Sequence, residues 1–131
     1  MMLPNVEISA MQTAILSQDQ INARVCYLET IGRVTGTPHE IEIWFASDGA
    51  TIWLLSGGMD RADWVRNLRR NPVVRVRIGQ QWFSGIAVEI TDPAEDRIAR
   101  ERVAGKYYGL RNGELPNEWS RTSLPIRITL T

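Results

Sequence analysis

Two apolar runs joined by a glycine-bounded connection constrain the fold of this 131-residue chain more than any other stretch. The segment 28–45 reads LETIGRVTGTPHEIEIWF, and apolar and polar residues alternate on both sides of the connection 32–36. This period-two pattern predicts a β-hairpin. Arg33 lies between Gly32 and Gly36, where we expect it to face outward at the tip. A basic side chain beside exposed backbone N–H groups favours binding of an anion such as a phosphate, although a solvated arginine on an ordinary turn explains the pattern equally well.

Strand and helix signals continue through the rest of the chain. They place strands at 51–56, 73–78, 82–90 and 125–130, and helices at 60–70 and 92–108. We expect Asp60 to cap the first helix and Asp92, followed by a proline, to cap the second. The order has no βαβ rhythm. It therefore predicts an α+β, mainly β fold, a six-stranded antiparallel barrel with two or three short helices.

The chain length suits one domain with a sizeable core and is too short for two. Residues 24–131 carry all the predicted strands, and residues 1–23 are expected to form an N-terminal arm or short helix that packs on a partner subunit. Neither a secretory signal nor a long apolar run is recognisable. We therefore expect a cytoplasmic protein with no integral membrane segment.

Composition limits the classes of function. Fifteen basic residues balance fifteen acidic ones, so the whole chain has no charge that favours nucleic acid. Six arginines nevertheless fall within residues 61–77, where they predict either local positive potential or a solvated helix face. A single cysteine, Cys26, and a single histidine, His39, exclude an internal disulfide and a multi-histidine metal site. Cys26 is expected to be buried.

Patterns of nucleophilic catalysis are missing, and His39 is expected to be an ordinary strand residue. Glu40 and Glu42 fit either an acid–base pair or an exposed strand face, and the five tryptophans fit either a planar cofactor or the core. The Arg33 turn, the Gly57-Gly58 entry to the first helix and its arginines could form one anion-binding rim. These signals favour a planar, phosphate-bearing redox cofactor that supplies the chemistry itself.

Four blocks of sequence resemble the deazaflavin-dependent nitroreductase family. They are TIGRVTGTPH at 30–39, LSGG at 55–58, DWVRNLRRNP at 63–72 and VRVRIG at 74–79. That family belongs to the flavin-binding split β-barrels related to pyridoxamine phosphate oxidases. The resemblance extends from about Arg24 to the C-terminus. The G-R-x-[ST]-G turn followed by W-x-x-N-L-x-x-N-P makes it specific.

The resemblance implies a homodimeric split barrel that binds reduced coenzyme F420, a deazaflavin with a phosphate and an oligoglutamate tail. Hydride transfer to a quinone, nitroaromatic or enone would follow. The residues that it places at the cofactor are Arg33, Thr35, Gly36, His39, Ile41, Glu42, Ser56, Gly57, Trp64 and Asn67. The positive charge of the helix adds Arg66 and Arg69 as helpers of Arg33 in phosphate binding. Tyr107 and Tyr108 are candidate proton donors, because they end a helix that could cap the site.

Two family lysines are replaced in this chain. Val34 follows the turn arginine where many members have lysine, and Ser56-Gly57-Gly58 lacks the lysine of an S-K-G-G sequence. Flavin mononucleotide (FMN), with its shorter anionic tail, is therefore an alternative cofactor, and a non-catalytic binding module of the same fold is an alternative function. RNA binding is disfavoured, because aromatic residues do not interleave with the arginines.

Overall fold

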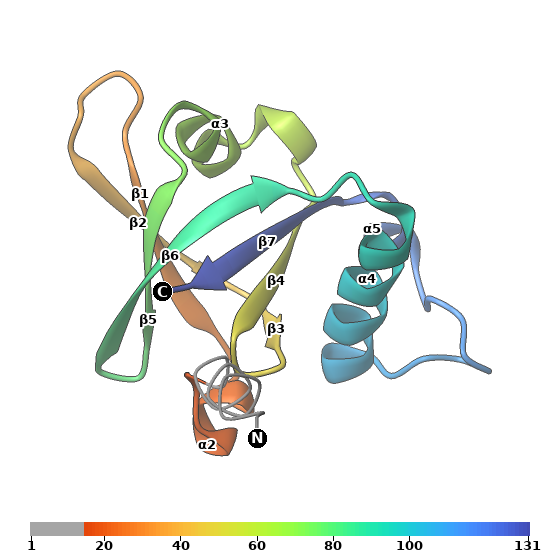
Figure 1. Cartoon of the computed structure of the whole chain (residues 1–131). Helices are drawn as coiled ribbons and strands as arrows, with labels where there is room; N and C mark the ends of the chain where they lie inside the picture. Colours follow the sequence, from red (N-terminus) through yellow and green to blue (C-terminus); the bar gives the residue numbers. More distant parts are fainter. Residues whose placement is uncertain (1–14) are drawn as a thin grey trace, which may run out of the picture.

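A seven-stranded antiparallel sheet coils into a partly closed barrel in the computed structural model, which describes residues 15–131 (Figure 1). The strands are β1 (Cys26–Ile31), β2 (Pro38–Ile43), β3 (Ala46–Ser47), β4 (Thr51–Ser56), β5 (Val73–Ile78), β6 (Gln81–Glu89) and β7 (Leu124–Leu130), in the spatial order β2-β1-β5-β6-β7-β4-β3. The predicted antiparallel barrel is confirmed. The two-residue strand β3 is additional and lies where we expected the start of a turn.

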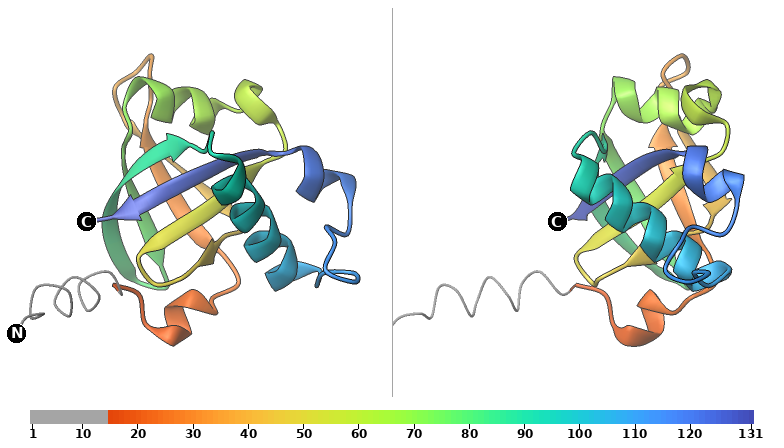
Figure 2. Two further views of the ribbon diagram at one scale, coloured as in Figure 1. Left: turned by 45° about the vertical axis from the view of Figure 1, so that its right-hand side comes forward. Right: turned by 90° about the vertical axis from the view of Figure 1, so that its right-hand side faces the viewer.

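Five helical segments of the described residues lie around the barrel. They are α2 (Gln18–Ile21), the 3₁₀ helix η1 (Met59–Arg61), α3 (Asp63–Arg70), α4 (Pro93–Tyr107) and α5 (Glu118–Thr122). α3 lies at one end of the barrel beside the β1–β2 hairpin, α2 lies at the other end, and α4 packs against the side (Figures 1 and 2). Within residues 15–131, no helix is both long enough and apolar enough to span a membrane.

The core has two parts. Inward-facing residues of the strands fill the barrel, among them Leu28 and Val76, and Cys26 is fully buried there as predicted. A second cluster lies between β4 and α4, where Trp53 and Leu55 pack with Ala99 and Val103 of the helix. β4 is therefore buried on both faces, which explains why its sequence is almost wholly apolar.

A glycine allows close packing inside the barrel. A Cβ atom on Gly85 of β6 would lie 2.6 Å from Cγ2 of Ile128 and 3.0 Å from the backbone oxygen of Thr129, both on β7. Strand β6 nevertheless runs unbroken from Gln81 to Glu89. The interior glycine thus marks a close approach between two strands.

The two expected helix caps have different outcomes. The Asp92 carboxylate accepts a hydrogen bond from the Glu95 backbone N–H at 2.9 Å, which confirms the predicted start of α4. The prediction that Asp60 caps the other helix is wrong. Asp60 lies in η1, and α3 begins at Asp63 after Ala62, which provides no side-chain cap.

The ends of the chain also depart from simple periodicity. α5 has no counterpart among the predicted helices, because it is too short for helical periodicity to reveal it. At the other end, Leu16 is buried in the barrel core, and Ile15 packs beside it. The rest of the predicted arm, residues 1–14, lies outside the described part of the chain, so the partner contact of the arm stays a prediction.

Candidate functional site

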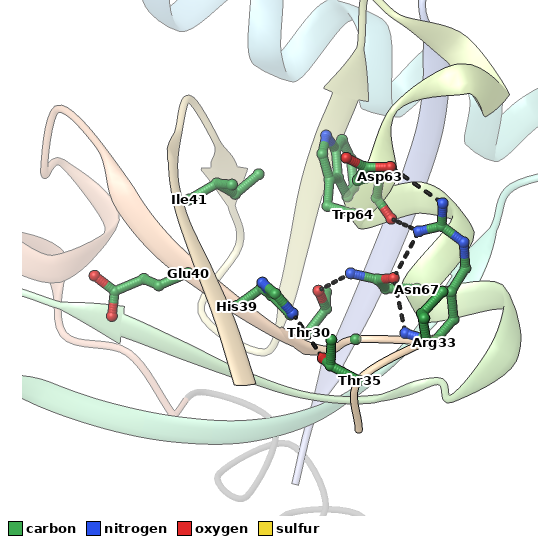
Figure 3. A pocket seen from close by; sticks show the side chains of 11 residues that line it. Thr30, Arg33, Thr35, His39, Glu40, Ile41, Asp63, Trp64 and Asn67 are labelled. Carbon is green, nitrogen blue, oxygen red and sulfur yellow. Dashed lines mark hydrogen bonds and ion pairs between the residues drawn. The ribbon is translucent and has the colours of Figure 1, made fainter. Parts of the chain in front are cut away.

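A pocket of about 360 Å³ opens between the β1–β2 hairpin and α3 (Figure 3). It is lined by Thr30, Gly32, Arg33, Val34, Thr35, His39, Glu40, Ile41, Asp63, Trp64 and Asn67. His39 and Ile41 share one face of β2, because side chains alternate along a strand. The pocket therefore combines the glycine-bounded turn, the strand that follows it and the start of the arginine-rich helix.

Asn67 connects the helix to the hairpin. Its side chain is buried, its Nδ2 donates to Thr30 Oγ1 at 3.1 Å, and its Oδ1 accepts from the backbone N–H of Arg33 at 3.1 Å and from Arg33 Nη1 at 2.9 Å. One amide thus satisfies a buried hydroxyl, a backbone donor and a guanidinium. Because an unpaired buried polar group is costly, this network fixes the turn against α3.

The prediction that Arg33 faces outward is wrong. Besides the contact with Asn67, Arg33 Nη2 lies 3.2 Å from Asp63 Oδ1 and forms an ion pair with it. Val34, whose relative exposure is 87%, occupies the tip of the turn instead. The physical reason is the amide and carboxylate that α3 presents within reach, which sequence spacing alone does not reveal.

Gly32 makes room for a histidine. A Cβ atom at this buried position would lie 2.5 Å from His39 Nε2 and 2.6 Å from Thr35 Oγ1. Thr35 Oγ1 and His39 Nε2 are themselves 3.2 Å apart, within hydrogen-bonding distance. Gly36 closes the turn with φ +72°, a conformation that favours glycine, and its N–H donates to the Gly32 carbonyl at 2.8 Å. The turn thus places one hydroxyl and one imidazole at the pocket.

Charge is distributed unevenly around the pocket. Its lining contains one arginine, Arg33, and two carboxylates, Asp63 and Glu40. The unneutralised positive charge lies next to the pocket, on η1 and on the exposed side of α3. There the side chains of Arg61, Arg66 and Arg70 form no ion pair with any carboxylate of residues 15–131.

The structure brings together half of the predicted cofactor residues. Arg33, Thr35, His39, Ile41, Trp64 and Asn67 line the pocket, and Gly36, Glu42, Ser56, Gly57, Arg66 and Arg69 do not. Thr30, Gly32 and Asp63 line it without having been predicted as cofactor residues. Asp63 could have been found from the helix motif, because it lies one turn before Asn67 and therefore on the same face.

Residues outside the pocket have other contacts. Glu42 accepts a hydrogen bond from the Tyr27 hydroxyl at 3.0 Å, on the face of β2 opposite to Ile41. The Ser56 hydroxyl donates to the Met59 carbonyl at 3.0 Å, and Gly57 lies against the Trp119 indole. Arg69 forms ion pairs with Glu89 and with Asp60. These contacts hold the elements around the pocket in place.

The two tyrosines considered as proton donors belong to an aromatic cluster. The Tyr107 ring stacks on Trp44 with centroids 4.3 Å apart, and Tyr108 and Trp119 approach Trp44 edge-on. The Tyr107 hydroxyl donates to the Arg24 carbonyl at 2.7 Å, and burial raises the pKa of Tyr107. Neither tyrosine lines the pocket, so a role in proton donation stays a prediction.

Comparison with known proteins identifies relatives of this architecture. The model of the F420H(2)-dependent quinone reductase family matches residues 6–130. An F420H(2)-dependent quinone reductase of Mycobacterium tuberculosis is 30% identical over 112 residues, a match that covers 79% of this chain and 69% of the relative. These similarities confirm the resemblance to deazaflavin-dependent enzymes.

Solved structures share the fold. An F420 reductase has a TM-score of 0.60 at 19% identity, covering 87% of this chain and 92% of its own. A candidate pyridoxamine 5'-phosphate oxidase of Listeria innocua has a TM-score of 0.63 at 18% identity, covering 95% of this chain and 93% of its own. The predicted split β-barrel is confirmed. The match over nearly the whole sequence, together with this fold, shows that the chain belongs to the F420H(2)-dependent quinone reductase family.

Proposed function

We propose that this chain is an oxidoreductase that binds reduced coenzyme F420 in the pocket between the β1–β2 hairpin and α3 and reduces a quinone. The observation that carries the proposal is the Asn67 network, which holds the turn against the helix that bears Trp64. When bound, reduced coenzyme F420 supplies a hydride to the acceptor. The chain itself supplies binding, orientation and exclusion of water.

The pocket lining fits a planar ring. Trp64 and Ile41 offer apolar surface, and an aromatic side chain stacks well on a flat ring system. Thr35 and His39 offer hydrogen-bonding groups on the other side of the same pocket. Gly32 is required for this arrangement, because any larger residue would push the His39 imidazole out of its place.

The anionic chain of the cofactor fits the arginines beside the pocket. Arg61, Arg66 and Arg70 are exposed and have no carboxylate partner among the described residues, so they could pair with phosphate and glutamate groups. Arg33 shares its charge with Asp63 and therefore acts mainly in shaping the turn. In this way the three exposed arginines compensate for the two family lysines that the chain lacks.

Turnover with a quinone tests the proposal. Reduced coenzyme F420 is mixed with menadione, and the absorbance of the oxidised deazaflavin is followed with and without the protein. We expect catalysed oxidation by the parent chain, much weaker catalysis by Asn67→Ala and parental activity in Arg97→Ala, a control on the exposed surface of α4. The proposal would be contradicted if the parent does not accelerate oxidation of the cofactor and instead binds FMN tightly. A nitroaromatic in place of menadione then tests the class of acceptor.

We also propose that the protein is a homodimer. Val73, Ile86 and Val88 are exposed to 54, 40 and 37% and lie on the outer face of β5 and β6. Beside them Glu29 of β1 and Arg75 of β5 neutralise each other in an ion pair. A two-fold axis would bring this apolar face of each copy against the same face of the other. This face supports a contact between two copies.

A further inference from the structure

Lys106 is the one lysine of the sequence, in which fifteen residues are lysine or arginine. It lies near the end of α4, one residue before Tyr107. Its environment differs from that of the arginines that form ion pairs, because the ammonium group has backbone carbonyl groups as partners. The side chain is half-buried. All the other residues of this set are arginines, so position 106 has a specific requirement for lysine.

The requirement is geometric. Lys106 Nζ donates to the carbonyl oxygens of Ile21 at 3.0 Å, Ala23 at 2.7 Å and Phe45 at 3.0 Å. It also lies 3.8 Å from the centroid of the Phe45 ring. A lysine ammonium carries three donors on one nitrogen, and three acceptors converge on it here. An arginine spreads its donors over three nitrogens in a plane and cannot reproduce this arrangement.

These bonds hold residues 21–24, which we call the strap, against the barrel. Lys106 contacts two strap carbonyls, and the hydroxyl of the neighbouring Tyr107 donates to the Arg24 carbonyl at 2.7 Å. Two consecutive side chains of α4 thus hold three backbone carbonyl groups of the four-residue strap. The arginine side chain of Arg24 itself is exposed. Loss of the Lys106 bonds would therefore loosen the strap.

A pocket adjoins the Lys106 side chain. Its volume is about 340 Å³, and Ser47, Glu101 and Arg102 also line it. Burial lowers the pKa of Lys106 to about 8, so on the order of a tenth of the amines are neutral at pH 7. Cys26 does not compete as a nucleophile, because burial raises the pKa of its thiol to about 12. Arg102 adds a positive charge that favours an anionic reagent.

We propose that Lys106 is an acylation site, and that its acylation by an acyl phosphate releases the strap from the barrel. The lone pair of Nζ attacks the acyl carbon, an N–C amide bond forms, the C–O bond to phosphate breaks, phosphate leaves, and Nζ gives one proton to solvent. No oxidation or reduction occurs. The amide keeps one N–H donor, so two of the three carbonyls lose their partner.

The reagent for the test is acetyl phosphate, added to the folded parent protein. Mass spectrometry then locates the acetyl groups, which on side-chain amines can only be at Lys106. Trypsin next reports on the strap, because the bond after Arg24 lies at its end. Leaving a buried acceptor unpaired costs about 1–3 kcal/mol, so acetylation should speed cleavage after Arg24 by roughly ten- to a hundredfold.

Two variants complete the test. Lys106→Gln cannot be acetylated, has too short a side chain to reach the three carbonyls and should show the faster cleavage without any reagent. Arg97→Gln removes a positive charge from the same helix, where Arg97 pairs only with Glu101, and should behave as the parent. If Lys106→Gln does not fold, the rate of cleavage after Arg24 in the acetylated parent still tests the proposal. An unmodified Lys106 alongside an acetylated α-amino group overturns the proposal, and so does acetylated Lys106 with parental cleavage after Arg24.

Discussion

Single side chains determine the shape of the pocket. Asn67 joins three groups of two different elements, and Arg33 depends on it for its position. His39 packs over Gly32, so the strand position 39 can hold a histidine only while the turn position 32 is a glycine. The turn is therefore held by hydrogen bonds and packing contacts that the sequence of the turn alone does not predict.

Gly32→Ala tests the packing of the histidine. The added Cβ would lie 2.5 Å from His39 Nε2, so the ring must move. Overpacking of this kind costs about 1–3 kcal/mol, and we expect a lower melting temperature in thermal unfolding. The double variant Gly32→Ala/His39→Ala should recover the part of the loss that comes from the imidazole, while the contact with Thr35 Oγ1 at 2.6 Å remains. A double variant as unstable as Gly32→Ala would show that the clash with His39 is not the cause.

Arg33→Ala tests the charge at the turn. Loss of the guanidinium removes hydrogen bonds to Asn67 and Asp63, and charge-assisted bonds are worth about 1.5–3 kcal/mol, so coenzyme F420 should bind roughly ten- to a hundredfold more weakly. Arg33→Lys should recover part of this, because an ammonium does not reproduce a planar fork. Titration calorimetry measures the affinity of both variants.

The control for that titration is Arg97→Ala. Arg100 on the same helix is unsuitable, because its side chain is only 13% exposed, pairs with Asp96 and donates to the Ser120 carbonyl. The Arg97 side chain is 67% exposed, and its one ion pair within residues 15–131 is with Glu101, one turn away. If Arg33→Ala folds and binds the cofactor as tightly as the parent does, the turn has no role in cofactor binding.

At the scale of elements, the strands were the most predictable part. The alternation in 73–78 gave the bounds of β5, and the proline after Asp92 gave the start of α4. η1 and α5 were not predictable, because segments of three and five residues are shorter than the helical repeat needs. The contact of Arg33 with α3 was missed for another reason: it joins residues 30 positions apart, and sequence spacing does not record such a distance.

The different outcomes of the two aspartates give a matched prediction. Asp92→Ala removes a side-chain cap from α4 and should lower the free energy of unfolding by about 1 kcal/mol. Asp60→Ala removes only an exposed ion pair with Arg69, with 3.8 Å between Asp60 Oδ2 and Arg69 Nη1, and should cost less than about 0.5 kcal/mol. Urea denaturation compares the two. Equal losses of unfolding free energy in the two variants would show that Asp60 also acts as a helix cap.

For the whole molecule, the outer face of β5 and β6 is the surface to test. Ile86→Arg places a charge among exposed apolar residues and should dissociate the proposed homodimer without unfolding the barrel. Light scattering at micromolar concentration measures the mass, and Ile98→Arg on α4, where the side chain is also an exposed isoleucine, serves as the matched control. A parent mass near 14.9 kDa, that of a single chain, would contradict the homodimer.

The central claim is that the pocket between the hairpin and α3 holds coenzyme F420, and Trp64 is its most direct probe. Trp64 lines the pocket, is half-buried and packs against the edge of the barrel core, so thermal unfolding must first show that Trp64→Ala is folded. Loss of an aromatic stacking partner together with its buried area should weaken binding about tenfold, which corresponds to about 1.4 kcal/mol. The deciding measurement is the dissociation constant of coenzyme F420 for the parent, Trp64→Ala and Arg97→Ala, determined by calorimetry. The account predicts weaker binding for Trp64→Ala alone. Equal affinity of all three proteins would place the cofactor elsewhere and contradict it.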